Sequence, residues 1–321
     1  MLISGSNVKV TFKVGSIFKP QPLLAVAGVN FDIAEKETFA IVGESGSGKT
    51  TLARAINGLL PISSGKILFD DAELNTLSNK EMKAYRRQMA MIFQDPIGSL
   101  SPRMTVGNII TEPFRIHGMA FNLDKEIRRL LSLVGLPSHF IDRYPHQLSG
   151  GQARRVGVAR AIALNPRLII ADEPTAGLDV SVQGEVLNLL NDLKHELGLS
   201  MLIITHNLHV VRRIADRMAV MYLGRFVEVN STKTIFEAPA HPYTAALLSA
   251  NPHPDPDYQH DRIALPADVP SLMARPSGCE FHTRCPWVKD KCHTEPPYDI
   301  SAGGHIACHF PLKPNSKLPY P

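Results

Sequence analysis

Hydrophobic residues in the first two thirds of the chain fall into two alternating patterns. Short apolar runs are typical of buried strands, and longer segments repeat apolar residues every three or four positions, as an amphipathic helix does. The runs predict strands at residues 25–33, 37–43, 65–69, 88–94, 168–172, 201–205 and 217–222. The helical spacing predicts helices at residues 49–60, 123–135, 150–164, 181–197 and 207–215. This alternation predicts an α/β fold with a largely parallel sheet.

The pattern changes after about residue 238. The segment that follows, "APAHPYTAALLSANPHPDPDYQHD", is rich in Pro and His, and Pro stays frequent to the end. Such a composition predicts a second, smaller and less regular unit. We therefore expect two units, at residues 1–238 and 239–321.

Composition and charge narrow the function only a little. The chain has 321 residues, 44% of them apolar, and a net charge of +4. The basic residues are spread along the chain, which gives little support for nucleic-acid binding. No apolar run approaches the roughly 18 residues of a membrane span, and no basic start precedes a hydrophobic signal core. We expect a chain that neither crosses a membrane nor leaves the cytosol by a standard signal.

The first candidate site is the stretch "GESGSGKT" at residues 43–50, which fits the pattern GxxxxGK(S/T). It lies between a predicted strand and a predicted helix, the order that a phosphate-binding P-loop requires. Glycines let successive backbone N–H groups turn toward an anion, and the helix N-terminus adds partial positive charge. Lys49 would reach the β- and γ-phosphates of a nucleotide, and the Thr50 hydroxyl would bind Mg²⁺. The predicted nucleotide-binding residues are Gly43, Ser45, Gly46, Ser47, Gly48, Lys49, Thr50 and Thr51.

A second candidate is the pair of acids that ends the apolar run "RLIIADEP". Asp172 is expected beside the Mg²⁺ site. Glu173 can orient and deprotonate a water that attacks the γ-phosphate in line with the leaving ADP. Two adjacent acids after a strand are often only a surface turn, but the P-loop favours the catalytic interpretation.

A third candidate is "LSGGQARRVGVARAIA" at residues 148–163. Ser149, Gly150 and Gly151 open a helix, and an exposed helix N-terminus is a second anion site. One chain thus carries two phosphate-binding elements, which is too many for one γ-phosphate unless they serve different sites.

With these motifs the sequence resembles the ATP-binding subunits of ABC transporters. The segment "LSGGQ" resembles the family's signature motif, and "FQD" with Gln94 resembles its Q-loop. The segment "AGLD", which ends at Asp179, resembles the D-loop, and His206 in "IITHN" corresponds to the switch histidine. All are present in the family order. The resemblance implies a P-loop NTPase fold of the ABC type: a RecA-like core, an antiparallel β subdomain and an α-helical subdomain at about residues 95–165.

The resemblance also implies roles. Two such domains would pack head to tail, so that the signature of one subunit closes over the ATP bound by Lys49 of the other. Glu173 would be the general base, and His206 would hydrogen-bond the γ-phosphate. Phe12 is expected to stack on adenine, with Phe18 as its rival. The remaining roles are Mg²⁺ ligation by Thr50, Gln94 and Asp172, water contact by Gln94, and signature contacts by Ser149, Gly150, Gly151 and Gln152.

The end of the chain narrows the subfamily. The segments "HPYTAALLSANPHPDPD" and "PSGCEFHTRCPWVKDKC" resemble the tail of oligopeptide and dipeptide transporter ATPases, and more closely the F-type than the D-type subunit. The resemblance implies an ATP hydrolase that powers import of di- or oligopeptides, although nickel, opine and sugar importers share this tail. The implied partners are two permease subunits, a second and paralogous ATPase and, indirectly, a solute-binding protein. The implied location is the cytoplasmic face of the inner membrane.

Two further questions stay open at this stage. Val106, Ile109, Ile110 and Phe114 lie at near-helical spacing, which predicts either core packing or, by the resemblance, contact with a permease. A soluble ABC ATPase that acts on nucleic acid or ribosomes is the alternative function. Proteins of that kind usually carry two ATPase units or long coiled coils, and this sequence has neither.

All four cysteines lie in the tail: Cys279, Cys285, Cys292 and Cys308. A cytosolic location disfavours disulfides, and the spacings lack the CxxC pairs of most structural zinc sites. Four thiolates can hold a [4Fe–4S] cluster, and the resembled subfamily is associated with one. We therefore predict an iron–sulfur cluster, with zinc or free thiols as alternatives.

Overall fold

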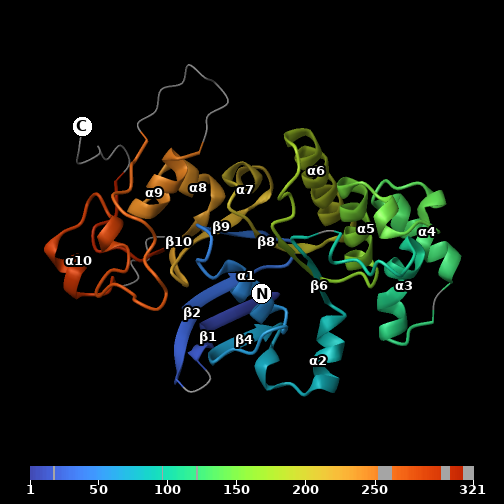
Figure 1. Cartoon of the computed structure of the whole chain (residues 1–321), viewed down its shortest axis with the longest axis horizontal. Coiled ribbons are helices and arrows are strands. Elements are labelled where there is room, and N and C mark those ends of the chain that lie inside the picture. The colour runs from blue at the N-terminus through green and yellow to red at the C-terminus, as the bar shows by residue number, and fades with distance from the viewer. Residues whose placement is uncertain (17–18, 96, 121, 252–261, 298–303, 314–321) are drawn as a thin grey trace.

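The computed structural model describes residues 1–16, 19–95, 97–120, 122–251, 262–297 and 304–313. In these residues two β-sheets are surrounded by helices (Figure 1). The larger sheet has the strand order β11-β10-β9-β3-β8-β7-β6. Its strands are β3 (Thr38–Val42), β6 (Met89–Ile92), β7 (Leu168–Asp172), β8 (Ser200–Ile204), β9 (Arg217–Tyr222), β10 (Arg225–Ser231) and β11 (His305–Ile306). The predicted α/β fold is confirmed.

The centre of the larger sheet is parallel. β3 pairs in parallel with β8 and β9, and β7 pairs in parallel with β6 and β8. Every residue of β3, β7 and β8 is buried, as expected for strands covered on both faces. Parallel strands end at one edge, so the loops after β3, β7 and β8 meet there, and this edge is where ligands bind in such sheets.

The second sheet is antiparallel, with the order β2-β1-β4-β5. Its strands are β1 (Ile3–Ser16), β2 (Lys19–Ile33), β4 (Ser64–Phe69) and β5 (Ala72–Glu73). Helix α1 (Lys49–Ile56) contacts strands of both sheets, and its buried Leu52 and Ile56 share one apolar core with Ile41, Ile67 and Leu202. This core fixes the direction in which α1 leaves the P-loop.

The other helices cover the sheets and the ends of the molecule. They are α2 (Asn79–Arg86), α3 (Val106–Ile116), α4 (Leu123–Leu133), α5 (Gly150–Ile162), α6 (Val180–Leu197), α7 (Leu208–Ile214), α8 (Thr232–Glu237), α9 (Pro242–Ser249) and α10 (Asp290–Thr294). Short 3-10 turns occupy Leu74–Thr76, Ser138–Phe140, Pro145–Gln147 and His282–Arg284.

Helices α3, α4 and α5 form a helical unit at one end of the molecule, on the right in Figure 1. The four apolar residues of α3 that the sequence analysis left open are all buried in the core of this unit: Val106, Ile109, Ile110 and Phe114. Core packing therefore accounts for these four side chains.

The described residues after 238 lie at the opposite end, on the left in Figure 1. Strand β11 pairs antiparallel with β10, which makes it the edge strand of the larger sheet. Tyr243 and Phe281 share an apolar core with Tyr222 of β9 and Val42 of β3. We call this part, residues 239–313 as described, the C-terminal unit. It does not enclose a core of its own, so the boundary at 238 stays a prediction.

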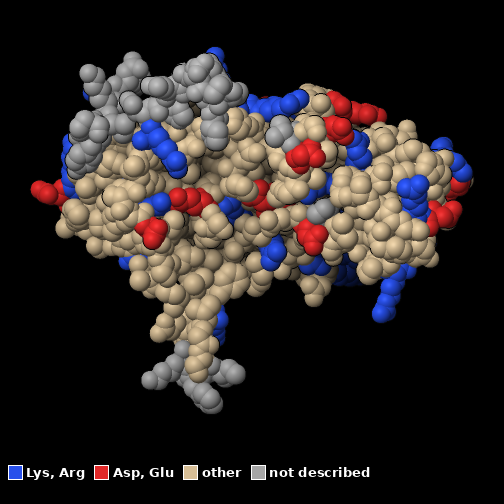
Figure 2. All heavy atoms as spheres, turned by 45° about the horizontal axis from the view of Figure 1, so that its top comes forward, with Lys and Arg blue, Asp and Glu red and all other residues tan. Residues whose placement is uncertain are grey.

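Within the described residues, no helix combines the length and the apolar character that crossing a membrane requires. Figure 2 shows Lys and Arg side chains at separate places on one face, with Asp and Glu side chains between them. This face carries no continuous basic track.

We expect Phe281→Ala to destabilise the C-terminal unit. The ring is 2% exposed, and its centroid lies 5.3 Å from that of Tyr222 and 5.4 Å from that of Tyr243. Loss of such a ring leaves a cavity and should lower the free energy of unfolding by about 3–5 kcal/mol. Urea titration followed by the fluorescence of the single tryptophan, Trp287, measures the change. The exposed control Val269→Ala should cost less than about 0.5 kcal/mol; equal losses in both variants would contradict the expectation.

Candidate functional site: the P-loop pocket

The turn from β3 into α1 depends on two glycines. Gly43 and Gly48 have φ angles of +150° and +101°. A Cβ atom at Gly43 would lie 2.2 Å from the carbonyl oxygen of Met221, and one at Gly48 would lie 2.4 Å from that of Ala25. Any larger residue would collide with backbone that cannot move independently. The P-loop is therefore packed directly against the end of β9 and the middle of β2.

Lys49 is buried at the start of α1. Its Nζ donates to the carbonyl oxygens of Gly43 and Glu44, both at 2.8 Å, and contacts the Ser47 hydroxyl at 3.4 Å. Burial lowers the pKa of Lys49, while the carboxylates of Glu173 and Asp172 act against this shift. The ammonium group thus lies at the N-terminus of a helix, a position where an anion is stabilised.

Asp172, the last residue of β7, lies beside the P-loop. Its Oδ1 accepts a hydrogen bond from the Thr50 hydroxyl at 3.1 Å. Burial raises the pKa of Asp172, so the carboxylate lacks full compensation for its charge. A carboxylate and a hydroxyl oxygen are the hard ligands that Mg²⁺ prefers. These two residues fit a Mg²⁺ ion.

Glu173 follows Asp172 with a φ of +50°, a conformation that costs energy in a residue with a side chain. Its carboxylate accepts from the Thr205 hydroxyl and from the His206 backbone N–H, both at 3.1 Å. The Nδ1 atom of His206 lies 2.7 Å from the same carboxylate. The loop after β8 therefore holds Glu173 in one orientation.

Lys49, Thr50, Glu173 and His206 meet in a pocket with a volume of about 680 Å³. The predicted site residues Gly43, Ser47 and Asp172 are not among its lining residues. Its polar end combines the P-loop with three single residues from other loops. Its apolar end includes Phe12 and Leu23, which face each other across β1 and β2. The rival adenine-stacking candidate, Phe18, lies outside the described residues. The lining residues are Phe12, Leu23, Ala25, Glu44, Ser45, Gly46, Gly48, Lys49, Thr50, Thr51, Gln94, Glu173, His206 and Leu272.

The signature segment lies elsewhere. Ser149 caps the N-terminus of α5: its hydroxyl accepts from the Gln152 N–H, and the Gln152 side chain accepts from the Ser149 N–H. A Cβ at Gly150 would meet nothing within 4 Å, so that glycine leaves open space. None of the lining residues of the P-loop pocket comes from residues 148–152. Asp179 likewise stands apart and caps α6 through the Val182 N–H.

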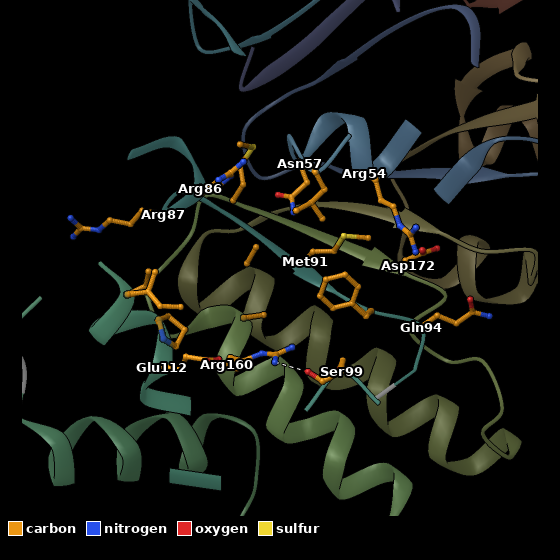
Figure 3. Close-up of a pocket in the computed structure, with 18 of the residues that line it drawn as sticks. Arg54, Asn57, Arg86, Arg87, Met91, Gln94, Ser99, Glu112, Arg160 and Asp172 are labelled. Atoms are coloured by element: carbon orange, nitrogen blue, oxygen red, sulfur yellow. Dashed lines mark hydrogen bonds between the residues drawn. The ribbon is translucent and has the colours of Figure 1, made fainter. Parts of the chain in front are cut away.

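A second and larger cavity, of about 860 Å³, adjoins this site. Figure 3 shows Arg86 and Arg87 at one end and Gln94 and Asp172 at the other. Between them the Arg160 guanidinium donates to the Ser99 carbonyl oxygen at 2.8 Å. Gln94 lines both cavities.

The prediction of an iron–sulfur cluster is wrong. Within the described residues, no group of three or more His, Cys, Asp or Glu side chains is arranged to hold a metal ion. Cys279 and Cys292 belong to the apolar core that contains Phe281. Burial raises the pKa of the Cys285 and Cys308 thiols to about 12. Cys279, Cys285 and Cys292 pack as small apolar residues in this core, and Cys308 is buried as well.

Sequence reasoning missed the role of Arg154, which supports the segment after Glu173. Arg154 is 3% exposed and donates to the carbonyl oxygens of Ala176, at 3.0 Å, and of Pro174. It thus ties the first turn of α5 to the segment after Glu173. The adjacent arginines "RR" at 154–155 were a visible signal, but charge alone does not tell a buried arginine from an exposed one.

A glycine turn around a buried lysine, with two acids at the end of another parallel strand of the same sheet, defines a P-loop nucleotide-binding protein. The chain matches the ABC transporter family at residues 26–176 and the C-terminal region of oligopeptide/dipeptide transporters at residues 227–292. It belongs to the ABC transporter family, and the resemblance inferred from the motifs is confirmed.

Similar proteins cover most of the chain. A putative peptide import ATP-binding protein of Brucella ovis is 49% identical over 87% of this chain and 90% of its own. The oligopeptide transport ATP-binding protein OppF of Haemophilus influenzae is 44% identical over 96% of both chains. Among solved structures, the dimeric ATP-binding cassette MJ0796 bound to ADP and Pi has a TM-score of 0.65 and 31% identity, and covers 72% of this chain and 98% of its own.

We expect Gly43→Ala to lower the free energy of unfolding by at least about 1 kcal/mol, since the new methyl group would overlap the Met221 carbonyl. The matched control is Gly157→Ala in α5, where a Cβ meets nothing within 4 Å. Alanine favours a helix, so this control should be neutral or stabilising by up to about 1 kcal/mol. Denaturant titration of both variants measures the difference. A neutral Gly43→Ala would show that the P-loop can shift away from β9.

Proposed function

We propose that the chain binds and hydrolyses ATP as one of two ATP-binding subunits that power a peptide importer. The observation that carries the proposal is the single pocket that joins Lys49, Thr50, Gln94, Glu173 and His206. The names of the Brucella and Haemophilus relatives support peptides as the cargo.

The residues of the pocket account for the chemistry. The Lys49 ammonium, with the P-loop N–H groups, binds the β- and γ-phosphates, and Phe12 stacks on adenine. Thr50, Asp172 and Gln94 would hold Mg²⁺, which would supply positive charge next to the phosphate oxygens. Glu173 accepts the proton of a water whose oxygen attacks the γ-phosphorus. The bond to the bridging oxygen breaks, and ADP leaves with its electron pair.

The pairing of His206 with Glu173 suggests how the base is oriented. With the two groups 2.7 Å apart, the imidazole can hold the carboxylate toward the water, or turn to a γ-phosphate oxygen. The 70% exposure of the His206 side chain leaves it free to make that turn. We keep the γ-phosphate contact as its proposed role.

The separation of the signature from the P-loop pocket supports a head-to-tail dimer. The N-terminus of α5 would close over the ATP of the second ATPase. It is surrounded by the signature residues Ser149, Gly150, Gly151 and Gln152. Asp179, at the start of the neighbouring α6, would lie at the same interface. The dimeric MJ0796 cassette is a structural precedent for such pairing.

The larger cavity supports contact with a permease. It lies between the helical unit and the sheet, and Gln94 connects it to the nucleotide pocket. A permease segment bound in this cavity would respond, through Gln94, to whether the nucleotide pocket holds ATP or ADP. Two permease subunits, a paralogous ATPase and an indirectly coupled solute-binding protein complete the proposed importer, at the cytoplasmic face of the inner membrane.

Co-purification from detergent-solubilised native membranes tests the assembly. We expect mass spectrometry to find two multi-span permeases, a second ATPase and a solute-binding protein with the chain. Recovery of the chain only with ribosomes or DNA would instead support the soluble ABC ATPase. The ligand of the binding protein can then be assayed directly.

We expect Glu173→Gln to reduce ATP turnover by at least about 10²-fold, because general-base catalysis contributes 10²–10⁴. ATP binding should persist, and the variant should accumulate as a closed dimer on size-exclusion chromatography with ATP. Lys49→Ala is the matched control, since it should lose nucleotide binding as well. Turnover at the wild-type rate in Glu173→Gln would remove the general-base assignment.

A further inference from the structure

One wall of the P-loop is formed by the C-terminal unit. Arg284 donates to both carboxylate oxygens of Glu44, from Nη1 to Oε2 at 2.7 Å and from Nη2 to Oε1 at 3.0 Å. Its Nε donates to the carbonyl oxygen of Ala267 at 2.9 Å. The Arg284 side chain is 6% exposed. The Glu44 side chain is 29% exposed, so the pair is partly buried. A two-pronged pair of arginine and carboxylate is among the stronger and more directional polar contacts in proteins.

A second contact fixes the backbone of the same P-loop residue. The Glu44 N–H donates to the hydroxyl oxygen of Tyr243 at 3.0 Å. Tyr243 is fully buried, and its ring packs 4.8 Å from that of Tyr222. The hydroxyl therefore has little freedom to follow a displaced loop.

Glu44 also touches the lysine of the site. Its carbonyl oxygen accepts from the Lys49 Nζ at 2.8 Å. All three polar parts of Glu44 thus have partners. Its side chain and N–H contact the C-terminal unit, and its carbonyl oxygen contacts the Lys49 ammonium, which would bind the phosphates. A displacement of Glu44 would move an acceptor of Lys49.

The C-terminal unit also contributes a lining residue, Leu272, to the pocket itself. The same unit therefore contacts the nucleotide pocket directly through Leu272 and indirectly through Glu44.

We propose that Arg284 is a positioning residue for nucleotide binding, which holds Glu44 and through it keeps the P-loop and Lys49 in the arrangement that receives the phosphates. The C-terminal unit is then a working part of the ATP site. The inference rests on the proposed ATP-binding function. It assigns Arg284 no contact with the nucleotide.

The test measures Mg-ATP affinity of the full-length chain by isothermal titration calorimetry. Arg284→Gln should raise the Kd about tenfold, because the loss of a charge-assisted pair costs somewhat more than one neutral hydrogen bond. Arg284→Lys, which can restore one of the two bonds, should recover part of the affinity. In turnover assays KM should rise while kcat at saturating ATP changes less than about twofold, since the base and water sites are untouched.

Two controls separate positioning from general damage. Lys291→Gln breaks the surface pair with Glu295 in the same unit and should leave the Kd unchanged. Glu44→Gln removes the partner charge, and adding Arg284→Gln to it should change the Kd less than about twofold, because the contact is already broken. Additive losses would mean that Arg284 acts by another route.

The outcomes are distinguishable. A folded Arg284→Gln protein with the wild-type Kd would overturn the inference. If thermal melting shows that this variant is unfolded, the Glu44→Gln variant decides in its place: a wild-type Kd overturns the inference, and a weakened one supports it. A wild-type chain that fails to bind Mg-ATP would refute the proposed function itself.

Discussion

The packing of the P-loop against neighbouring backbone is the constraint on which the site depends. Gly43 and Gly48 let the loop pass within contact distance of the carbonyls of Met221 and Ala25. The Gly224 N–H then donates to the Ser47 carbonyl at 2.8 Å, which ties the loop to the β9–β10 turn. Since β3 lies between β8 and β9, the loop inherits its position from the centre of the sheet. Lys49 and the first turn of α1 are aimed by the same contacts.

This rigid setting brings groups together at an energetic cost. Burial lowers the pKa of Lys49 and raises that of Asp172, so each is driven toward its neutral form. Glu173 adds a strained backbone. A triphosphate near Lys49 and a divalent cation near Asp172 supply the charges that relieve both shifts. Groups with shifted pKa values gather at functional sites, because ligand binding offsets the free-energy cost that these groups impose on the folded protein.

The sequence predicted the features that depend on local pattern. β7, β8 and the P-loop were predicted because apolar runs and glycine spacing are visible within a few residues. Helix α2 was missed because Met82 is its one buried residue, although the Ser78–Glu81 capping box was a readable signal. Helix α9 was missed because it lies in a Pro-rich segment. Here Pro242 is the first residue of the helix, where proline is favoured, and His241 is the N-cap.

Features set by long-range contacts could not be predicted. β11 is two residues long and exists because His305 and Ile306 meet β10. The four cysteines lie close together in sequence, but only the fold shows that they are packed as small apolar residues and that the described residues form no metal-binding group. Arg284 and Glu44 are 240 residues apart, so neither residue type nor spacing connects them.

The pocket has two walls that belong to different parts of the chain. The P-loop wall is joined to the C-terminal unit through Glu44 and Arg284. The Glu173 wall is joined to the helical unit, because Arg154 of α5 donates to carbonyl oxygens of the segment that follows it. The helical unit and the C-terminal unit lie at opposite ends of the molecule. The two ends of the molecule therefore each support one side of the space between Lys49 and Glu173, in which the proposed γ-phosphate site lies.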